Sequence, residues 1–298
     1  MKLPTFIIIG AARAGTTSLY EYAGQHPDVY VSPVKEPNFF AVEGRRLRHQ
    51  GPGESALRWV TDFDSYVELF RGAPGRCAAG EASPLYLYSQ TAPRLIRHYL
   101  PDVRLVAILR DPVERAYSAF SYLRERGSEP HANFLDALED EDRRVKENWS
   151  HIWHYRRMGF YYEQLSRYYE RFSSDQIRIL LYEDLAHDPG RVAMQLFEHI
   201  RVDSSFEPDT SIRRNVSGDS RYALLAPLFR PNRVTNRLRP LLSQRFGPLV
   251  ARAKDRVLVK PPMPVEAART LGALYRSDVE RLQDLIKRDL SNWLSSTS

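Results

Sequence analysis

Two glycines, an arginine and a run of hydroxyl side chains lie close together near the start of the chain. Gly10 and Gly15 are separated by four residues, and Arg13 lies between them. Thr16-Thr17-Ser18 follows and opens a predicted helix over 16–25. The glycines allow a tight turn that a ligand can approach closely. A helix N-terminus adds backbone N–H groups and the positive end of its dipole, so this combination predicts a phosphate-binding loop.

The spacing of the two glycines is that of the Walker A loop, G-x-x-x-x-G-K-[ST], but the lysine of that motif is missing. Thr16 occupies its position, and the cation of the loop is Arg13 instead. An ATPase without this lysine loses the group that holds the β- and γ-phosphates. The loop is therefore predicted to bind phosphate, while the usual nucleoside triphosphatase function is disfavoured.

A second group of polar residues follows the apolar segment 103–109, which predicts a buried strand. Arg110 ends this strand, and Asp111-Pro112 supplies an N-cap and a first-turn proline for the next helix. Ser118 lies two turns into that helix. An arginine fork and a hydroxyl in these places are suited to binding one phosphate group. The alternative is a structural Arg110–Asp111 ion pair with Ser118 on the surface.

Both segments resemble signatures of the sulfotransferases that use 3'-phosphoadenylyl sulfate (PAPS). The first has the form G-x-x-[KR]-x-G-T-T-S-L-Y of the family's phosphosulfate loop, and the second has its R-x-P-x-x-R-x-x-S element. The resemblance implies that PAPS is the sulfuryl donor, that Arg13 stabilises the leaving oxygen, and that Arg110 and Ser118 bind the 3'-phosphate. No metal is expected. The cofactor-binding residues expected here are Arg13, Ala14, Gly15, Thr16, Thr17, Ser18, Arg110 and Ser118.

The segment Lys-Glu-Pro-Asn-Phe-Phe at 35–40 is similar to the part of heparan-sulfate-type and bacterial sulfotransferases that carries a catalytic glutamate. By this resemblance Glu36 is the base that takes the proton of the acceptor hydroxyl. Lys35 is a further catalytic candidate, and whether it shares the role of Arg13 stays open. A solvated Glu36, or one paired with either cation, is the alternative, and Glu81 is the second candidate base.

Residues 213–221 look like the family's later loop, which closes over the nucleotide. On this likeness Ser217, Gly218 and Arg221 are expected to contact the cofactor. Further likenesses, at the helix start over 159–165 and the turn at 182–185, extend the resemblance over most of the chain.

The elements that must position these residues alternate between strand and helix. Apolar runs predict strands over 5–9, 28–32, 77–80, 103–109 and 177–182, and helical spacing predicts helices over 16–25, 62–71, 91–99, 112–126, 133–147, 160–172 and 190–200. This pattern predicts an α/β fold, with a P-loop-like central parallel sheet, helices on both faces and a helical C-terminal extension. Ligands of such sheets bind beyond the carboxyl ends of the strands. We expect one sulfotransferase domain over 1–298, with its core over about 1–210 and a lid and extension over about 211–298.

Composition narrows the class of protein further. With 43% hydrophobic residues the chain can bury a full core, and a net charge of +6 favours an anionic ligand, although solvated arginines also explain it. A single cysteine, Cys77, excludes an internal disulfide framework and fits a reducing compartment. No apolar run approaches the ~20 residues that span a bilayer, and Pro4 argues against a signal peptide. We therefore expect a cytoplasmic location and no transmembrane segment.

The leading interpretation is an enzyme that moves a sulfuryl group from PAPS, releasing 3',5'-adenosine bisphosphate (PAP). The resemblance implies a hydroxyl or amine acceptor on a carbohydrate or glycolipid. One alternative is a kinase-like P-loop phosphotransferase, which the missing Walker lysine disfavours. The other is a basic, non-catalytic module that binds long polyanions in a salt-sensitive way. Nucleic acid is not expected as a partner, because basic and aromatic residues do not interleave along one predicted strand.

Overall fold

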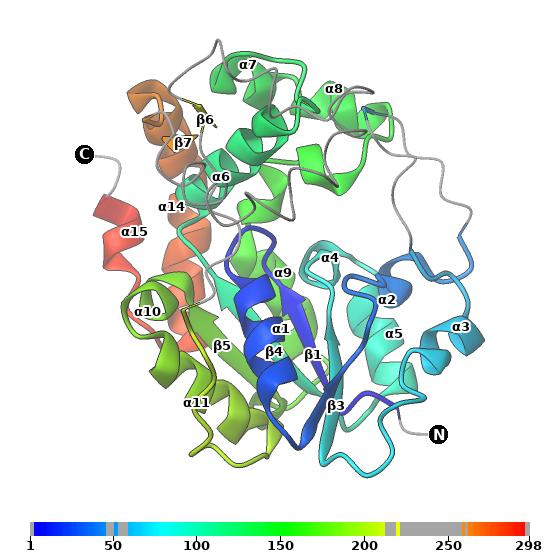
Figure 1. The fold of residues 1–298 in the computed structure, drawn as a ribbon. Coiled ribbons are helices and arrows are strands. Elements are labelled where there is room, and N and C mark those ends of the chain that lie inside the picture. The colour runs from blue at the N-terminus through cyan, green and yellow to red at the C-terminus, as the bar shows by residue number, and fades with distance from the viewer. Residues whose placement is uncertain are drawn as a thin grey trace, which may run out of the picture.

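The core of the protein is a five-stranded parallel sheet with the strand order β2-β3-β1-β4-β5 (Figure 1). The computed structural model describes residues 3–45, 51–52, 59–211, 219–220, 258–259 and 262–295. The strands of this sheet are β1 (Phe6–Gly10), β2 (Val29–Val31), β3 (Ala78–Ala82), β4 (Arg104–Leu109) and β5 (Ile177–Leu181). Each lies within two residues of a predicted strand at either end. The predicted α/β fold with a central parallel sheet is confirmed.

The interior strands are mostly apolar or small because both faces of the sheet are covered, and the buried Glu81 of β3 is an exception. Every residue of β1 and β3 is buried. Ile7 of β1 lies beside Glu81 of β3 on one side and Leu105 of β4 on the other. Phe6 packs over Gly80 so closely that a Cβ atom on Gly80 would lie 2.5 Å from the ring. The small side chains of β3 are therefore what allows the bulky β1 to pack beside it.

Helices cover both faces of the sheet, as predicted (Figure 1). On one face α1 (Thr16–Gln25) packs against α11 (Pro189–Ile200), and on the other α9 (Tyr161–Tyr169) packs against α4 (Leu85–Tyr88) and α14 (Val265–Ile286). The other elements are α2 (Phe39–Val42), α3 (Phe63–Glu68), α5 (Ala92–Tyr99), α6 (Pro112–Glu125), α7 (Phe134–Glu139), α8 (Glu141–Lys146), η2 (His151–Trp153), η3 (Arg157–Gly159), η4 (Ser174–Gln176), α10 (Tyr182–His187), α15 (Ser291–Ser295) and the short pair β6 (Asp219–Ser220) and β7 (Leu258–Val259).

The C-terminal helix α14 is fixed to the sheet domain by a capping contact. The carboxylate of Asp278 accepts the backbone N–H groups of Tyr162 at 3.0 Å and Glu163 at 3.4 Å, which belong to the first turn of α9. Those N–H groups have no partner inside their own helix. Tyr275 packs against Gly159, where a Cβ atom would lie 2.5 Å from its ring. The predicted helical C-terminal extension is confirmed, and no helix of the described residues is long and apolar enough to cross a membrane.

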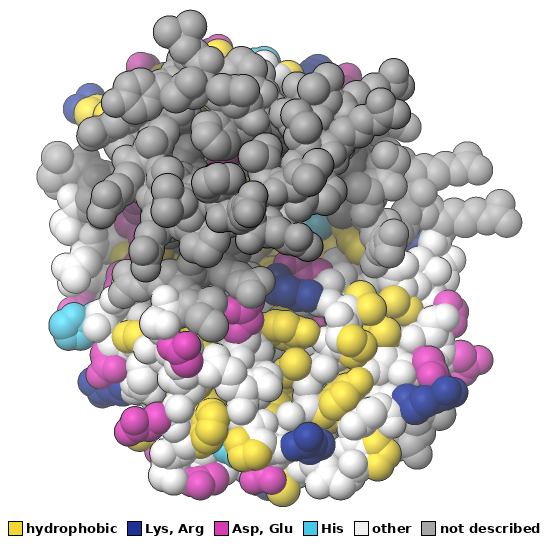
Figure 2. Space-filling view, in the orientation of Figure 1, with side chains coloured by type: hydrophobic (Ala, Val, Ile, Leu, Met, Phe, Trp, Pro, Cys, Tyr) yellow, Lys and Arg dark blue, Asp and Glu magenta, His cyan; other side chains and the backbone are white. Residues whose placement is uncertain are grey.

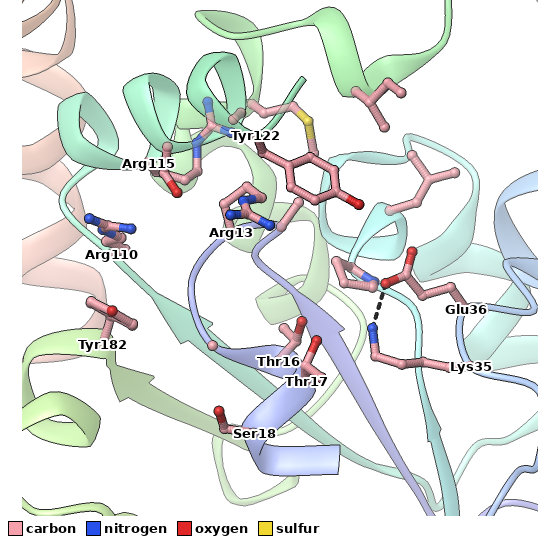
Figure 3. A pocket seen from close by; sticks show the side chains of 18 of the residues that line it. Arg13, Thr16, Thr17, Ser18, Lys35, Glu36, Arg110, Arg115, Tyr122 and Tyr182 are labelled. Atoms are coloured by element: carbon pink, nitrogen blue, oxygen red, sulfur yellow. Dashed lines mark hydrogen bonds and ion pairs between the residues drawn. The ribbon is translucent and has the colours of Figure 1, made fainter. Parts of the chain in front are cut away.

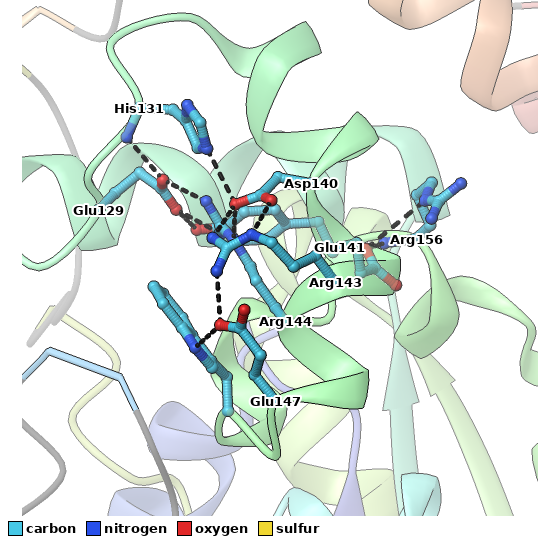
Figure 4. A network of polar contacts seen from close by, with 10 residues as sticks. Glu129, His131, Asp140, Glu141, Arg143, Arg144, Glu147 and Arg156 are labelled. Carbon is cyan, nitrogen blue, oxygen red and sulfur yellow. Dashed lines mark hydrogen bonds and ion pairs between the residues drawn. The ribbon is translucent and has the colours of Figure 1, made fainter.

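The prediction of one helix over 133–147 is wrong, because α7 and α8 are separate helices that meet at Asp140. Two charged side chains of this segment, Glu141 and Arg144, are buried, and both have partners of opposite charge (Figure 4). Arg144 and Glu129 are fully buried and joined by two bonds of 2.7 and 2.8 Å. Asp140 accepts from Arg143 at 2.6 Å and from His131 at 2.9 Å. Asp140, where the two helices meet, is thus bonded both within this segment and to His131 before it.

Candidate active site

A pocket of about 1000 Å³ opens where β1, β3, β4 and β5 end, between the turn after β1 and helix α6 (Figure 3). The predicted site residues that line it are Arg13, Gly15, Thr16, Thr17, Ser18, Lys35, Glu36, Arg110 and Ser118. Ala14, predicted to bind cofactor, is fully buried beneath this turn. Ser217, Gly218 and Arg221 lie outside the described residues. The fold thus brings segments about a hundred residues apart in the sequence around one cavity.

The turn after β1 needs glycine at the position that precedes α1. Gly15 has φ +104°, and a Cβ atom there would lie 2.7 Å from a methyl carbon of Leu185. Because both the backbone angle and the packing exclude a side chain, the turn stays tight and α1 begins at Thr16 as predicted. The N-terminus of α1 lines the pocket, so its backbone N–H groups and positive dipole end act on the same space.

Arg13 is held in the pocket wall by an aromatic ring. Its guanidinium carbon lies 4.3 Å from the ring centroid of Tyr122 on α6, and Arg126 lies 5.2 Å from the same centroid. Burial lowers the pKa of Arg13, Tyr122 opposes this shift, and the nearby positive charge of Arg110 adds to it. An arginine with a lowered pKa is still fully charged at neutral pH. The pocket therefore contains a fixed positive charge at the centre of Figure 3.

Arg110 directly follows β4 and lines the pocket. Its guanidinium pairs with Glu114 at 3.2 Å and lies 4.6 Å from the ring centroid of Tyr182. Asp111 instead caps α6, accepting from the backbone N–H of Val113 at 2.8 Å, and burial raises its pKa to about 6. Ser118 is buried and lines the pocket, so the alternative of a surface position is wrong.

Lys35 and Glu36 form an ion pair on the opposite side of the pocket from Arg110 (Figure 3). The Lys35 Nζ atom lies 2.6 Å from Glu36 Oε1, so the paired alternative is the one observed. The Glu36 side chain is 46% exposed. Exposed pairs of this kind contribute little stability and exchange partners readily. Glu36 is therefore both oriented by a cation and accessible from the cavity.

Glu81, the second candidate base, has no exposed surface. Its carboxylate accepts from the hydroxyl of Ser83 at 2.7 Å and from that of Tyr66 at 3.4 Å. Burial raises the pKa of Glu81 to about 7. Without exposed surface this carboxyl does not contact an acceptor directly. Among the described residues, no group of three or more His, Cys, Asp and Glu side chains is placed to hold a metal ion.

Sequence reasoning missed several side chains that line the pocket. Arg115 and Tyr122 share one face of α6 with Ser118, and Tyr182 follows β5 as Arg110 follows β4. The spacing 115, 118 and 122 is that of one helix face, so helical periodicity around Ser118 was the signal available. Arg115 is 1% exposed and donates to the backbone carbonyl of Tyr155. Arg115 is the second arginine of the motif that begins with Arg110, but no binding role was assigned to it from the sequence.

The surface beside the pocket carries charges of both signs. In the space-filling view of Figure 2, acidic side chains are interspersed with basic ones over the described part of this face. A long polyanion needs a continuous basic surface or stripe. Over the described residues of this face, the basic side chains lie apart from one another and form no continuous stripe.

Residues 3–220 match the family described as the sulfotransferase domain. The chain belongs to this family. A solved sulfotransferase from Alicyclobacillus acidocaldarius is 31% identical, with a TM-score of 0.79 over 98% of this chain and 99% of that one. The sulfotransferase fold expected from the two signatures is therefore confirmed for the sheet and its helices.

Curated relatives match this chain over smaller parts of their own length. Mouse (Mus musculus) heparan sulfate glucosamine 3-O-sulfotransferase 3B1 is 30% identical over 192 residues, which is 63% of this chain and 44% of the mouse protein. Mouse bifunctional heparan sulfate N-deacetylase/N-sulfotransferase 4 is 23% identical over 98% of this chain. The chain spans only 31% of the length of that second relative.

Proposed function

We propose that this protein transfers a sulfuryl group from PAPS to a hydroxyl or amine of a carbohydrate or glycolipid acceptor. One observation carries the proposal: both signatures and the Lys35–Glu36 pair line the same pocket. Hydrogen-bond donors and fixed positive charge lie on one side, and an accessible carboxylate lies on the other. A single domain acting in the cytoplasm is part of the proposal, and the single cysteine, Cys77, supports a reducing compartment.

The donor set of the pocket fits a nucleotide with two separated phosphate groups. The N-terminus of α1 and Arg13 would hold the phosphosulfate end. Arg110 and Ser118 would hold the 3'-phosphate, with a guanidinium fork and a hydroxyl directed at the same anion. The cavity of about 1000 Å³ is at the upper end of the usual range for ligand pockets. This volume suits a nucleotide together with part of an acceptor.

The two sides of the pocket divide the chemistry of transfer between them. The Glu36 carboxylate takes the proton of the acceptor oxygen as that oxygen forms its bond to sulfur. Electrons of the breaking sulfur–oxygen bond pass to the leaving phosphate oxygen, and the positive charge of Arg13 stabilises it there. Preorganised charge of this kind acts without reorganisation during the reaction.

The acceptor class is proposed from the relatives, whose names specify heparan sulfate glucosamine. The pocket itself supports it in one respect. Glu36 lines a cavity of about 1000 Å³, and the wall that carries it also contains Lys35, whose positive charge favours an acceptor with negative charge nearby. Chemically desulfated heparin oligosaccharides are therefore the first acceptors to test.

Nucleotide binding is the experiment that tests this function. Calorimetry with PAP, AMP and ATP–Mg²⁺, without acceptor, should give tight binding only for PAP, because only PAP carries the 3'-phosphate that Arg110 and Ser118 are placed to hold. Preference for ATP–Mg²⁺ would indicate the kinase-like alternative. Binding of none of the three would favour the polyanion-binding module.

Glu36→Gln should lower turnover about a hundredfold, because general-base catalysis contributes at least that factor. PAP release from PAPS with desulfated heparin as acceptor measures turnover, and calorimetry should give unchanged PAP affinity. Glu170→Gln is the matched control, since Glu170 is also an exposed carboxylate paired with its sequence neighbour, Arg171, at 2.8 Å. Equal turnover in the two variants would remove Glu36 as the base.

A further inference from the structure

The segment that carries Glu36 has an unusual backbone. Glu36 has φ +60° and Asn38 has φ +56°, with Pro37 between them. Side chains with a Cβ atom disfavour this left-handed region, and residues held there often lie at functional sites. Two such residues so close together require bonds from the surrounding structure that keep the backbone in this shape.

Those bonds come from the end of β3. The backbone N–H of Glu36 donates to the carbonyl of Ala82 at 3.1 Å, and that of Asn38 donates to the Ser83 hydroxyl at 3.1 Å. The side-chain amide of Asn38 closes the turn by donating to the carbonyl of Glu36 at 2.9 Å. Ser83 is therefore the only side chain among these contacts that joins the segment to the sheet.

Ser83 is itself oriented by Glu81. Its hydroxyl donates its proton to Glu81 Oε2 at 2.7 Å, which leaves the oxygen lone pairs to accept from Asn38. Ser83, Asn38 and Glu81 are all buried. A buried carboxyl on an interior strand is costly unless it is hydrogen-bonded. Burial raises the pKa of Glu81 to about 7, and the Tyr66 hydroxyl also donates to this carboxyl, at 3.4 Å.

We propose that Ser83 and Glu81 are positioning residues for Glu36, and that their hydrogen-bond chain holds the left-handed turn that presents the Glu36 carboxylate to the pocket. The inference rests on the proposed function of Glu36 as the base. It explains why a buried acidic residue is placed beside the site without contacting the cavity. It also explains why Ala82, between the two, contributes through its carbonyl alone.

Removing the Ser83 hydroxyl is the direct test. Ser83→Ala should lower kcat about tenfold or more, because small displacements of a reacting group have large effects on rate. PAP affinity should stay within about twofold of wild type, since the nucleotide side of the pocket is untouched. Amide hydrogen exchange over residues 35–40 should become faster. Glu81→Gln should reproduce both effects more weakly, because its amide oxygen still accepts from Ser83.

Ser121→Ala is the matched control. Ser121 is also buried and donates to a backbone carbonyl, that of Tyr117, at 2.9 Å, but it lies outside the residues that line the pocket. This variant should keep kcat and the exchange rates of residues 35–40. If Ser83→Ala has the same turnover as Ser121→Ala, the positioning role is wrong.

A double-mutant cycle separates positioning from general stability. If Ser83 acts through Glu36, Ser83→Ala should have no further effect on kcat in the Glu36→Gln background. Losses that multiply would overturn the proposal. If Ser83→Ala does not fold, the same cycle with Glu81→Gln tests whether the hydrogen-bond chain acts through Glu36. If Glu36→Gln alone retains full turnover, Glu36 is not the base and the positioning inference fails with it. Selective binding of PAP would still support the nucleotide part of the proposed function.

Discussion

The arginines of the α7–α8 region and those of the pocket are held by different kinds of partner. Arg144 is fully buried and makes two bonds to Glu129 and one to Asp140, at 2.7 to 3.0 Å. Arg13 and Arg110 lie 4.3 and 4.6 Å from the centroids of tyrosine rings. Carboxylates neutralise the charge and occupy the N–H donors, whereas a ring orients a guanidinium without neutralising it.

The difference teaches how one residue type serves architecture in one region and anion binding in another. A guanidinium surrounded by carboxylates has no capacity left for a ligand, and its removal would leave buried charge behind. A guanidinium on a ring keeps its charge, and both Arg13 and Arg110 line the cavity. Arg110 lies between these cases, because it also pairs with the partly exposed Glu114 at 3.2 Å.

The largest expected effect is on stability and comes from Arg144, the arginine held by carboxylates. Arg144→Ala should lower the free energy of unfolding by about 3–5 kcal/mol, because it leaves Glu129 charged, buried and without its main partner. Denaturant unfolding measures this change. PAP affinity of the folded fraction should not change. Arg143→Ala is the control, since the Arg143 side chain is 49% exposed and should contribute far less. Equal losses in the two variants would mean that burial does not distinguish these arginines.

The next largest effect comes from Arg110, which lies on a tyrosine ring. Its loss should weaken nucleotide binding and leave stability unchanged. Arg110→Ala should weaken PAP binding about a hundredfold, because a charge-assisted contact to the 3'-phosphate is lost. AMP, which lacks that phosphate, should bind the variant and the wild type equally. Calorimetry with both nucleotides gives the comparison. Wild-type affinity for PAP in the variant would show that the second signature has been assigned to the wrong group.

The smallest effect should be on turnover and should come from the ring of Tyr122. Tyr122→Leu removes the face on which Arg13 lies, a contact worth about 1 kcal/mol, so turnover should fall roughly fivefold. Tyr122→Phe keeps an aromatic face and should stay near wild type. Turnover of the two variants with PAPS and desulfated heparin tests the difference. If both lose activity equally, the hydroxyl matters rather than the ring.

Local patterns predicted much of the fold and the motif residues of the pocket wall. The apolar run before Gly10 and the hydroxyl run after Gly15 define β1 and the start of α1, because adjacent residues decide strand burial and helix initiation. Asp111 caps α6 for the same reason. The prediction of one helix over 133–147 was wrong because α7 ends and α8 begins at Asp140, whose carboxylate pairs with Arg143, Arg144 and His131.

The amino-acid sequence alone determined the alternation of strands and helices and the two signatures. It also determined which groups are available to bind an anion. Residues close in sequence determine those features through backbone preference and apolar spacing. Folding alone decided that Tyr122 supports Arg13 and that Asp278 caps α9. It also decided that Glu81 reaches the Glu36 segment through Ser83. Such contacts join residues far apart in the chain, and their energies depend on burial and distance, which exist only once the sheet has assembled.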